Sequence, residues 1–195
     1  MPPKKKTSLL DDLNGHVDKH NALSWSGTLR DYINMVIETP SIHRGAHKRV
    51  LDMIDEAGVE RDEDGTIIKY NFFDEDLFGI DDSIFEIMAY LRAAATGSEV
   101  SRRILLLYGP TSSGKSQLAV LLKRGLEKYS ATDSGKVFCL SESPMFEDPL
   151  CAIPMELRRR FSTEFGIKID GQLSPYMDLV LRDTYKGDFM SLPVK

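Results

Sequence analysis

Three stretches in the first half of the chain repeat apolar residues at the three- and four-residue spacing of an amphipathic helix. The first follows Thr28, a helix-capping residue with Asp31 three positions later, and stops before Pro40. The second ends at Gly58 and the third at Gly97, where C-terminal caps are expected. The pattern predicts three helices that pack through their apolar faces. Those faces carry Leu29, Tyr32, Ile33, Val36, Ile37, Val50, Leu51, Ile54, Ile84, Ile87, Met88 and Leu91.

A β-rich stretch, TIIKYNFF, follows the turn residues Asp64 and Gly65. An Asp-Gly pair between polar and β-prone residues is typical of a hairpin, so we predict one near residues 64–73. The acidic residues around the turn resemble the first half of a calcium-binding loop. Position twelve of that loop would be Asn71, where a bidentate glutamate is required, and we expect no calcium site here.

Two histidines, His43 and His47, stand four residues apart, as they do in zinc-binding helices. Arg44 takes the place of the glutamate in the HExxH pattern, and Gly45 weakens the helix that would carry the pair. We therefore interpret the two histidines as a surface pair.

A different arrangement follows residue 100. The unbroken apolar run Ile104–Leu107 is too short for a helix and predicts a strand buried on both faces in a parallel sheet. A helical pattern then covers Lys115–Tyr129. Between them Gly109–Ser116, GPTSSGKS, fits the pattern G-x-x-x-x-G-K-[ST] of a Walker A phosphate-binding loop, or P-loop. Strand, loop and helix in this order are the context that the motif requires.

The chemistry of phosphate binding explains the residue types in this loop. Several backbone N–H groups must point at one polyphosphate, and Gly109 and Gly114 let the chain curl that tightly. The following helix turns its positive end toward the phosphates, Lys115 adds a point charge, and the Ser116 hydroxyl is expected to hold Mg²⁺. The predicted loop residues are Gly109, Pro110, Thr111, Ser112, Ser113, Gly114, Lys115, Ser116 and Gln117, with Ser116 as the metal ligand.

Composition narrows the function further. The 195 residues, 42% of them hydrophobic, are ample for one domain with a core. The formal charge of −5 argues against a nucleic-acid partner. No apolar run approaches the roughly 18 residues of a membrane span, and no signal peptide is present, so we expect a cytoplasmic protein without a membrane partner. Cys139 and Cys151 lack CxxC spacing and are expected to be reduced thiols.

A P-loop alone does not define a reaction, because kinases, ATPases and GTPases share it. Hydrolysis needs a further acidic group, which normally ends another apolar strand. Glu142 follows the predicted strand 137–142 but comes after the interrupting Ser141, and Asp183 ends a stretch that predicts a helix. Neither fits the pattern well. The signatures of eukaryotic-type kinases are also absent, since Asp188 and Phe189 are followed by methionine rather than glycine.

Several stretches together resemble the N-terminal third of the PrkA-type serine protein kinases, whose N-terminal half is an AAA+ ATPase-like domain. They are WSGTLRDYI, FFDEDLFGIDDSI, RRILLLYGPTSSGKSQLAVLLKRGLE, SPMFEDPLCAIP and DTYKGDF, in that order. The resemblance implies ATP with Mg²⁺ as the cofactor. It also implies that residues 77–80 pack on the adenine, with Gly79 and Ile80 as the chosen contacts, although core packing explains these residues equally well. Ser112 and Ser113 stand where the family usually has glycines.

The expected fold is an α/β P-loop NTPase of AAA+ type with a truncated parallel sheet, preceded by a helical segment. We predict a flexible lead-in over 1–24, the helical segment with its hairpin over 25–98, and a partial nucleotide-binding core over 99–195. Because the chain stops at SLPVK before the family's acidic strand, sensor residues and kinase-like region, we expect an N-terminal portion that lacks the complete catalytic set.

Two functions remain open, beside a third interpretation in which the chain is a non-enzymatic fragment with no bound nucleotide. One is the ATP-binding portion of a PrkA-like protein kinase, whose full-length form would act on a serine or threonine of a protein substrate. The other is an AAA+ module in which the nucleotide switches binding or remodelling without phosphotransfer. The resemblance makes a homo-oligomer plausible for the intact protein.

Overall fold

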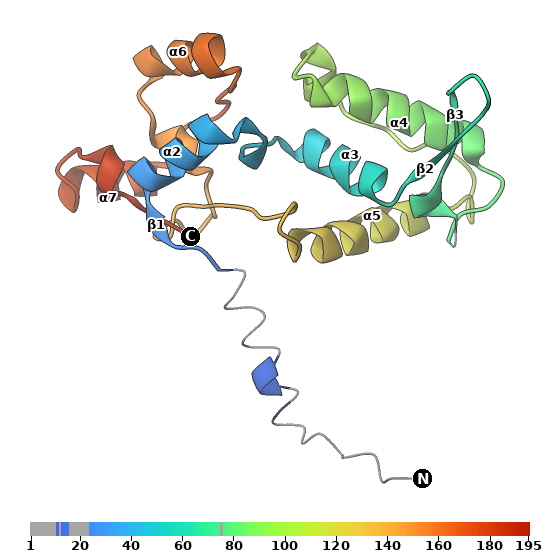
Figure 1. Cartoon of the computed structure of the whole chain (residues 1–195), viewed down its shortest axis with the longest axis horizontal. Helices are drawn as coiled ribbons and strands as arrows, with labels where there is room; N and C mark the ends of the chain where they lie inside the picture. Colours follow the sequence, from blue (N-terminus) through green and yellow to red (C-terminus); the bar gives the residue numbers. More distant parts are fainter. Residues whose placement is uncertain (1–10, 12, 16–23, 75) are drawn as a thin grey trace. The chain divides into compact units, whose positions relative to one another are not determined.

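The computed structural model describes residues 11, 13–15, 24–74 and 76–195 (Figure 1). The flexible lead-in predicted over 1–24 lies largely outside these residues. By its contacts the chain divides into two compact units: a central unit of residues 44–136, and a terminal unit of residues 1–43 and 137–195. The boundaries predicted after residues 24 and 98 differ from this division and stay a prediction.

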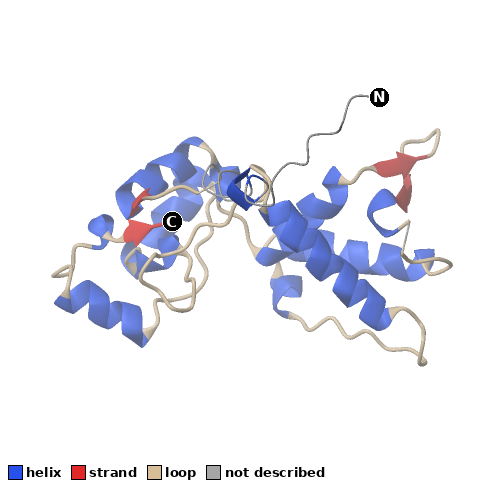
Figure 2. Ribbon diagram, turned by 90° about the horizontal axis from the view of Figure 1, so that it is seen from below, coloured by secondary structure: helices blue, strands red, loops and turns tan. Residues whose placement is uncertain are grey.

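The central unit is mostly helical (Figure 2). Its three long helices follow the apolar patterns of the sequence and bury them in one core that includes Ile54 and Met88, both fully buried. Arg44 Nη1 donates to Asp52 Oδ2 (2.8 Å) and to Tyr129 Oη (3.1 Å), which ties the start of the unit to two of these helices. The elements are α3 (Ala46–Glu56), β2 (Val59–Arg61), β3 (Ile67–Tyr70), the 3-10 helix η2 (Asn71–Phe73), α4 (Asp81–Ala95), the 3-10 helix η3 (Glu99–Arg102) and α5 (Lys115–Ser130).

The predicted hairpin is formed by β2 and β3, which pair antiparallel. The Asp62 carboxylate closes the turn, because its Oδ1 accepts from the main-chain N–H groups of Asp64 (3.1 Å) and Thr66 (2.7 Å). Gly65 has φ +83°, a left-handed conformation that glycine adopts without a steric penalty. The turn therefore forms where the Asp-Gly pair predicts it.

The strand predicted over Ile104–Leu107 is not formed, and this part of the expected fold was wrong. The segment pairs with no strand among the described residues, and Ile104 and Leu106 are 91% and 81% exposed. The sheets that the described residues form are two antiparallel pairs, β1 with β4 and β2 with β3, rather than a parallel sheet. A run of apolar residues shows that a segment could be buried in a sheet, but it does not supply the neighbouring strands that the sheet needs.

The terminal unit joins both ends of the described chain through β1, which pairs antiparallel with β4. Thr28 caps the first helix as predicted: its hydroxyl accepts from Asp31 N (3.3 Å), and Asp31 Oδ2 accepts from Thr28 N (2.9 Å). The elements are β1 (Gly27–Thr28), α2 (Leu29–Glu38), η1 (Pro40–Ile42), η4 (Pro149–Ala152), α6 (Met155–Phe165), α7 (Pro175–Asp183), η5 (Phe189–Ser191) and β4 (Pro193–Val194).

A second predicted strand, over 137–142, is also absent as a continuous element. Only Leu140 forms an isolated antiparallel bridge, with Val194 of β4. Leu140 nevertheless lies in the core of the terminal unit, together with Leu150 and Ile153 from the SPMFEDPLCAIP stretch.

Cys139 and Cys151 are buried free thiols, as expected. Among the helices of the described residues, none combines the length and the apolar character needed to cross a bilayer.

Candidate functional site

The loop 109–116 leads into α5, which begins at Lys115 and runs one residue further than predicted. Gly114 caps the helix with φ +81°, and its carbonyl accepts the first helical hydrogen bond from Leu118 N (2.8 Å). Ser112 also has a positive φ, +62°, which is uncommon for a residue with a side chain. The loop is therefore tightly curled immediately before the helix, as the spacing of the two glycines predicts.

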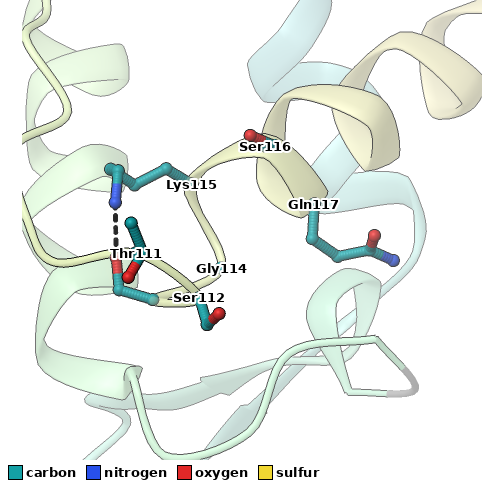
Figure 3. Close-up of a pocket in the computed structure, with 7 residues that line it drawn as sticks. Thr111, Ser112, Gly114, Lys115, Ser116 and Gln117 are labelled. Atoms are coloured by element: carbon teal, nitrogen blue, oxygen red, sulfur yellow. Dashed lines mark hydrogen bonds between the residues drawn. The ribbon is translucent and has the colours of Figure 1, made fainter.

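The curled loop surrounds a hollow of about 480 Å³ (Figure 3). Its lining consists of seven of the predicted residues: Thr111, Ser112, Ser113, Gly114, Lys115, Ser116 and Gln117. Gly109 and Pro110 are outside the lining but contribute carbonyl oxygens next to it. A Cβ on Gly109 would lie 3.0 Å from Ser113 Oγ, so a side chain there would crowd the loop.

The Lys115 ammonium folds back over the loop instead of entering an apolar core. Its Nζ donates to Gly109 O (2.9 Å), to Ser113 Oγ (2.8 Å) and to Pro110 O, and Figure 3 draws the bond to the Ser113 hydroxyl as a dashed line. These three acceptors are neutral oxygens. A phosphate oxygen carries a negative charge and would compete with them favourably, because charge-assisted hydrogen bonds are the stronger ones.

The start of α5 adds a second source of positive potential. Within the described part of the chain, the main-chain N–H groups of Lys115, Ser116 and Gln117 have no hydrogen-bond acceptor. Such free first-turn amides and the positive end of the helix dipole form an anion-binding arrangement. The Ser116 side chain is exposed at this position. The described residues contain no cluster of three or more His, Cys, Asp or Glu suited to a metal. A Mg²⁺ bound to Ser116 would therefore depend on phosphate oxygens and water for its other ligands.

The predicted adenine segment lies beside the loop. A Cβ placed on Gly114 would be 3.4 Å from Leu77 Cδ2 and 3.8 Å from Ile80 Cδ1. Gly79, between them in sequence, has φ +70° and open space around it. The structure thus brings Ile80 to the loop. Contact between Gly79 or Ile80 and a base stays a prediction.

Two polar contacts near the loop do not follow from the sequence pattern, although Ser113 itself was predicted as a loop residue. The Ser113 hydroxyl accepts from Lys115, a role that the motif pattern does not specify. Asp76 Oδ1 accepts from Gln117 Nε2 at 3.2 Å, which joins the residues before the adenine segment to the first turn of α5. Nothing in the sequence pairs positions 76 and 117, because the contact depends on how α5 packs.

The two carboxylates considered as magnesium ligands have other partners. Both lie in the terminal unit: Glu142 Oε1 accepts from Tyr185 Oη (2.8 Å), and Asp183 Oδ1 accepts from Arg182 Nε (2.9 Å). The seven residues that line the loop hollow include no carboxylate. Among the described residues, none of those that line the hollow is therefore an acidic partner for the P-loop.

The two histidines also have separate neighbours. His43 Nδ1 lies 3.3 Å from Asp148 Oδ2, and its Nε2 lies 3.3 Å from the Lys168 carbonyl oxygen. The His47 ring meets the Tyr90 ring edge-on, with 6.0 Å between the ring centroids. Each histidine is thus accounted for by contacts within its own unit.

Comparison with known proteins identifies the family. Residues 27–195 match the family model described as the PrkA AAA domain. The chain belongs to the PrkA AAA domain family. It is 41% identical over 188 residues to a Bacillus subtilis (strain 168) protein named ATP-dependent protease PrkA, a match that covers 96% of this chain and 30% of that protein. It is 30% identical over 154 residues to the Escherichia coli (strain K12) serine/threonine kinase YeaG, covering 72% of this chain and 23% of that protein.

The family assignment confirms the resemblance to PrkA proteins and identifies the chain as an AAA-type domain. The chain spans less than a third of the length of these two relatives. No solved structure matches it. The match to the family model runs through the boundary predicted between residues 98 and 99. The helical segment and the P-loop are therefore covered by one family model.

Proposed function

We propose that Gly109–Ser116 binds the phosphates of Mg·ATP, and that the chain is the ATP-binding portion of a PrkA-like serine protein kinase. The observation that carries the proposal is the position of Lys115. Its ammonium lies over the curled loop, within a hydrogen bond of Gly109 O and Ser113 Oγ, at the positive end of α5. Fixed positive charge and free amides at one point suit a polyphosphate.

The other predicted residues have roles that fit this arrangement. The amides of the loop and of the first turn would hold the phosphate oxygens, and Ser116 would contribute its hydroxyl to Mg²⁺. Thr111 and Gln117 flank the hollow, while Gly79 and Ile80 would contact the base. Bound Mg²⁺ would neutralise charge on the phosphates during transfer. Membership of an AAA-type family supports ATP as the nucleotide.

Phosphotransfer to serine or threonine of a protein is proposed only for the whole protein. It is supported by the Escherichia coli relative, which is named a serine/threonine kinase. We assign no catalytic residue within this chain, because the described lining of the loop hollow includes no carboxylate that could act as a base or hold the metal. We also propose that the intact protein is cytoplasmic, and the AAA+ resemblance supports the further proposal that it forms a homo-oligomer.

A second function is favoured by the other relative. The Bacillus subtilis protein, at 41% identity, is named an ATP-dependent protease rather than a kinase. This supports the alternative of an AAA+ module in which ATP drives a change in contacts with another protein, without phosphotransfer. The P-loop chemistry is the same in both cases, since the two functions differ only in what the bound nucleotide does.

The binding step is tested by the substitution Lys115→Ala. Removal of the ammonium should weaken the binding of a fluorescent ATP analogue about tenfold or more, because a charge-assisted contact to phosphate is lost. The circular dichroism spectrum should not change, since Lys115 contacts only its own loop. Lys123→Ala, an exposed lysine further along α5, is the matched control. Equal affinity of both variants and the unaltered chain would remove the P-loop assignment.

The reaction is tested on the full-length protein. Transfer of the γ-phosphoryl group of radiolabelled ATP to a serine-containing protein, lost in the Lys115→Ala variant, would support the kinase. Release of free phosphate without labelled protein would support the remodelling module. The first result obtained with residues 1–195 alone would contradict the view that the catalytic set lies outside this chain.

A further inference from the structure

A second groove, distinct from the loop hollow, runs along α5 in the central unit. Its volume is about 570 Å³, within the range of ligand-binding sites. One wall is α5 from Gln117 to Lys128, and the other is η2 with the residues that follow it, including Asp74 and Asp76. Of the described residues, Gln117 alone lines both the groove and the loop hollow.

The far end of the groove is basic. Arg124 and Lys128 stand four residues apart on α5, one helical turn, and neither has an acidic partner among the described residues. Like charges at this spacing repel and weaken a helix. By contrast Lys123, on the same helix, is 4.0 Å from Glu127. The two unpaired cations line the groove and favour an anionic group there.

The end beside the P-loop is acidic. Asp76 is held there by the hydrogen bond from Gln117, which occupies only one of its two carboxylate oxygens. Asp74 is paired with Lys69 at 2.7 Å, so among the described residues of the groove Asp76 is the carboxylate without a cationic partner. The two charged ends are therefore of opposite sign.

Apolar side chains lie between the two ends. Phe72, Val120 and Leu121 line the groove, and Val120 is 40% exposed. The Phe72 ring lies against α5 where Gly125 has no side chain: a Cβ on Gly125 would be 2.6 Å from Phe72 Cζ. The ring thus forms part of the groove floor beside the two cations, while Val120 and Leu121 lie between them and Gln117.

We propose that this groove binds a short polypeptide segment with a basic residue at the P-loop end, apolar residues in the middle and an acidic residue at the other end. From Gln117 to Lys128 the helix rises roughly 16 Å, which corresponds to about five residues of extended chain. A nucleic acid carries only negative charge and would meet Asp74 and Asp76, so it does not match both ends. The inference concerns peptide binding and does not depend on ATP.

The test uses the full chain and a fluorescein-labelled synthetic peptide with two lysines, two leucines and two glutamates in that order. Arg124→Glu combined with Lys128→Glu should weaken binding about tenfold, because two favourable charge contacts become repulsive. Lys123→Glu, the same change beside the groove lining, should leave the affinity unaltered. A peptide with lysines in place of the two glutamates should prefer the double variant. If the original peptide and a scrambled version of it bound equally well to the unaltered chain, the double variant and Lys123→Glu, the proposal would be overturned.

Two further arms separate this site from the P-loop and from other ligands. The Lys115→Ala variant should bind the peptide as the unaltered chain does, since its ammonium lies in the loop hollow. The peptide proposal and the ATP proposal can therefore fail separately, because each is tested by its own binding measurement. Displacement of the peptide by a single-stranded oligonucleotide, at concentrations where polyglutamate does not displace it, would assign the groove to nucleic acid and contradict the proposal.

Discussion

Gly125 shows how packing can reverse a local preference at one residue. Alanine is favoured over glycine inside a helix by roughly 1 kcal/mol. At this position, however, a Cβ would lie 2.6 Å from Phe72 Cζ and 2.8 Å from Met53 Sδ, and overpacking costs about 1–3 kcal/mol. We predict that Gly125→Ala lowers the free energy of unfolding by about 1 kcal/mol, measured by urea denaturation. Adding Phe72→Leu to the Gly125→Ala variant should restore part of the lost free energy of unfolding. An increase in stability would show that the ring is free to move away.

Cys151 gives a prediction that depends on pH. Burial is the main cause that raises the pKa of its thiol, to about 11, and burial also raises the pKa of Cys139. The unfolded chain loses these protons near pH 8.5. Between that pH and about 11 it binds fewer protons than the folded chain, so the free energy of unfolding should fall as the pH rises.

The reactivity of the same thiols provides the measurement. At pH 8 both should react with a thiol reagent much more slowly in the folded chain than in urea, because a buried protonated thiol is a poor nucleophile. Cys151→Ser should remove part of the pH dependence above pH 8.5. Rapid labelling of Cys151 in the folded chain would contradict its burial.

At the scale of an element, the segment Ile104–Tyr108 differs most from its expected structure. Leu106 is 81% exposed, whereas its neighbour Leu107 packs against the core of the central unit. We predict that Leu106→Lys changes the free energy of unfolding by less than about 0.5 kcal/mol, while Leu107→Lys lowers it by several times as much. Urea denaturation of the two variants provides the comparison. Equal losses would indicate that the segment is buried on both faces, as a parallel strand would be.

Local signals explain which elements were predictable. Thr28 with Asp31, and Gly114 before Lys115, fix helix starts through contacts within a few residues, so both starts and the loop between glycines follow from the sequence. The Asp-Gly turn is local in the same way. A strand needs a partner that is distant in sequence, and the apolar run at 104–107 does not identify one. The contact between Asp76 and Gln117 was missed for the same reason.

At the scale of the whole molecule, each compact unit has its own core and its own polar ties. In the terminal unit, Glu147 joins two segments: its carboxylate accepts from Ser143 Oγ (2.6 Å) and from Ser174 N (2.5 Å), the residue that caps α7. Ser143 is 2% exposed, so loss of the carboxylate would leave a buried hydroxyl without this partner. Glu147 is therefore a residue through which the terminal unit can be weakened without any change to the P-loop.

We predict that Glu147→Ala lowers the free energy of unfolding of the terminal unit by about 2–3 kcal/mol. Hydrogen exchange of the main-chain amides in this unit measures the change. Glu164→Ala, which removes an exposed pair with Arg160 on α6, should cost less than about 1 kcal/mol. Neither variant should change the affinity for a fluorescent ATP analogue, because every residue assigned to the nucleotide lies in the central unit. A loss of affinity in Glu147→Ala alone would contradict the assignment of the whole nucleotide site to the central unit.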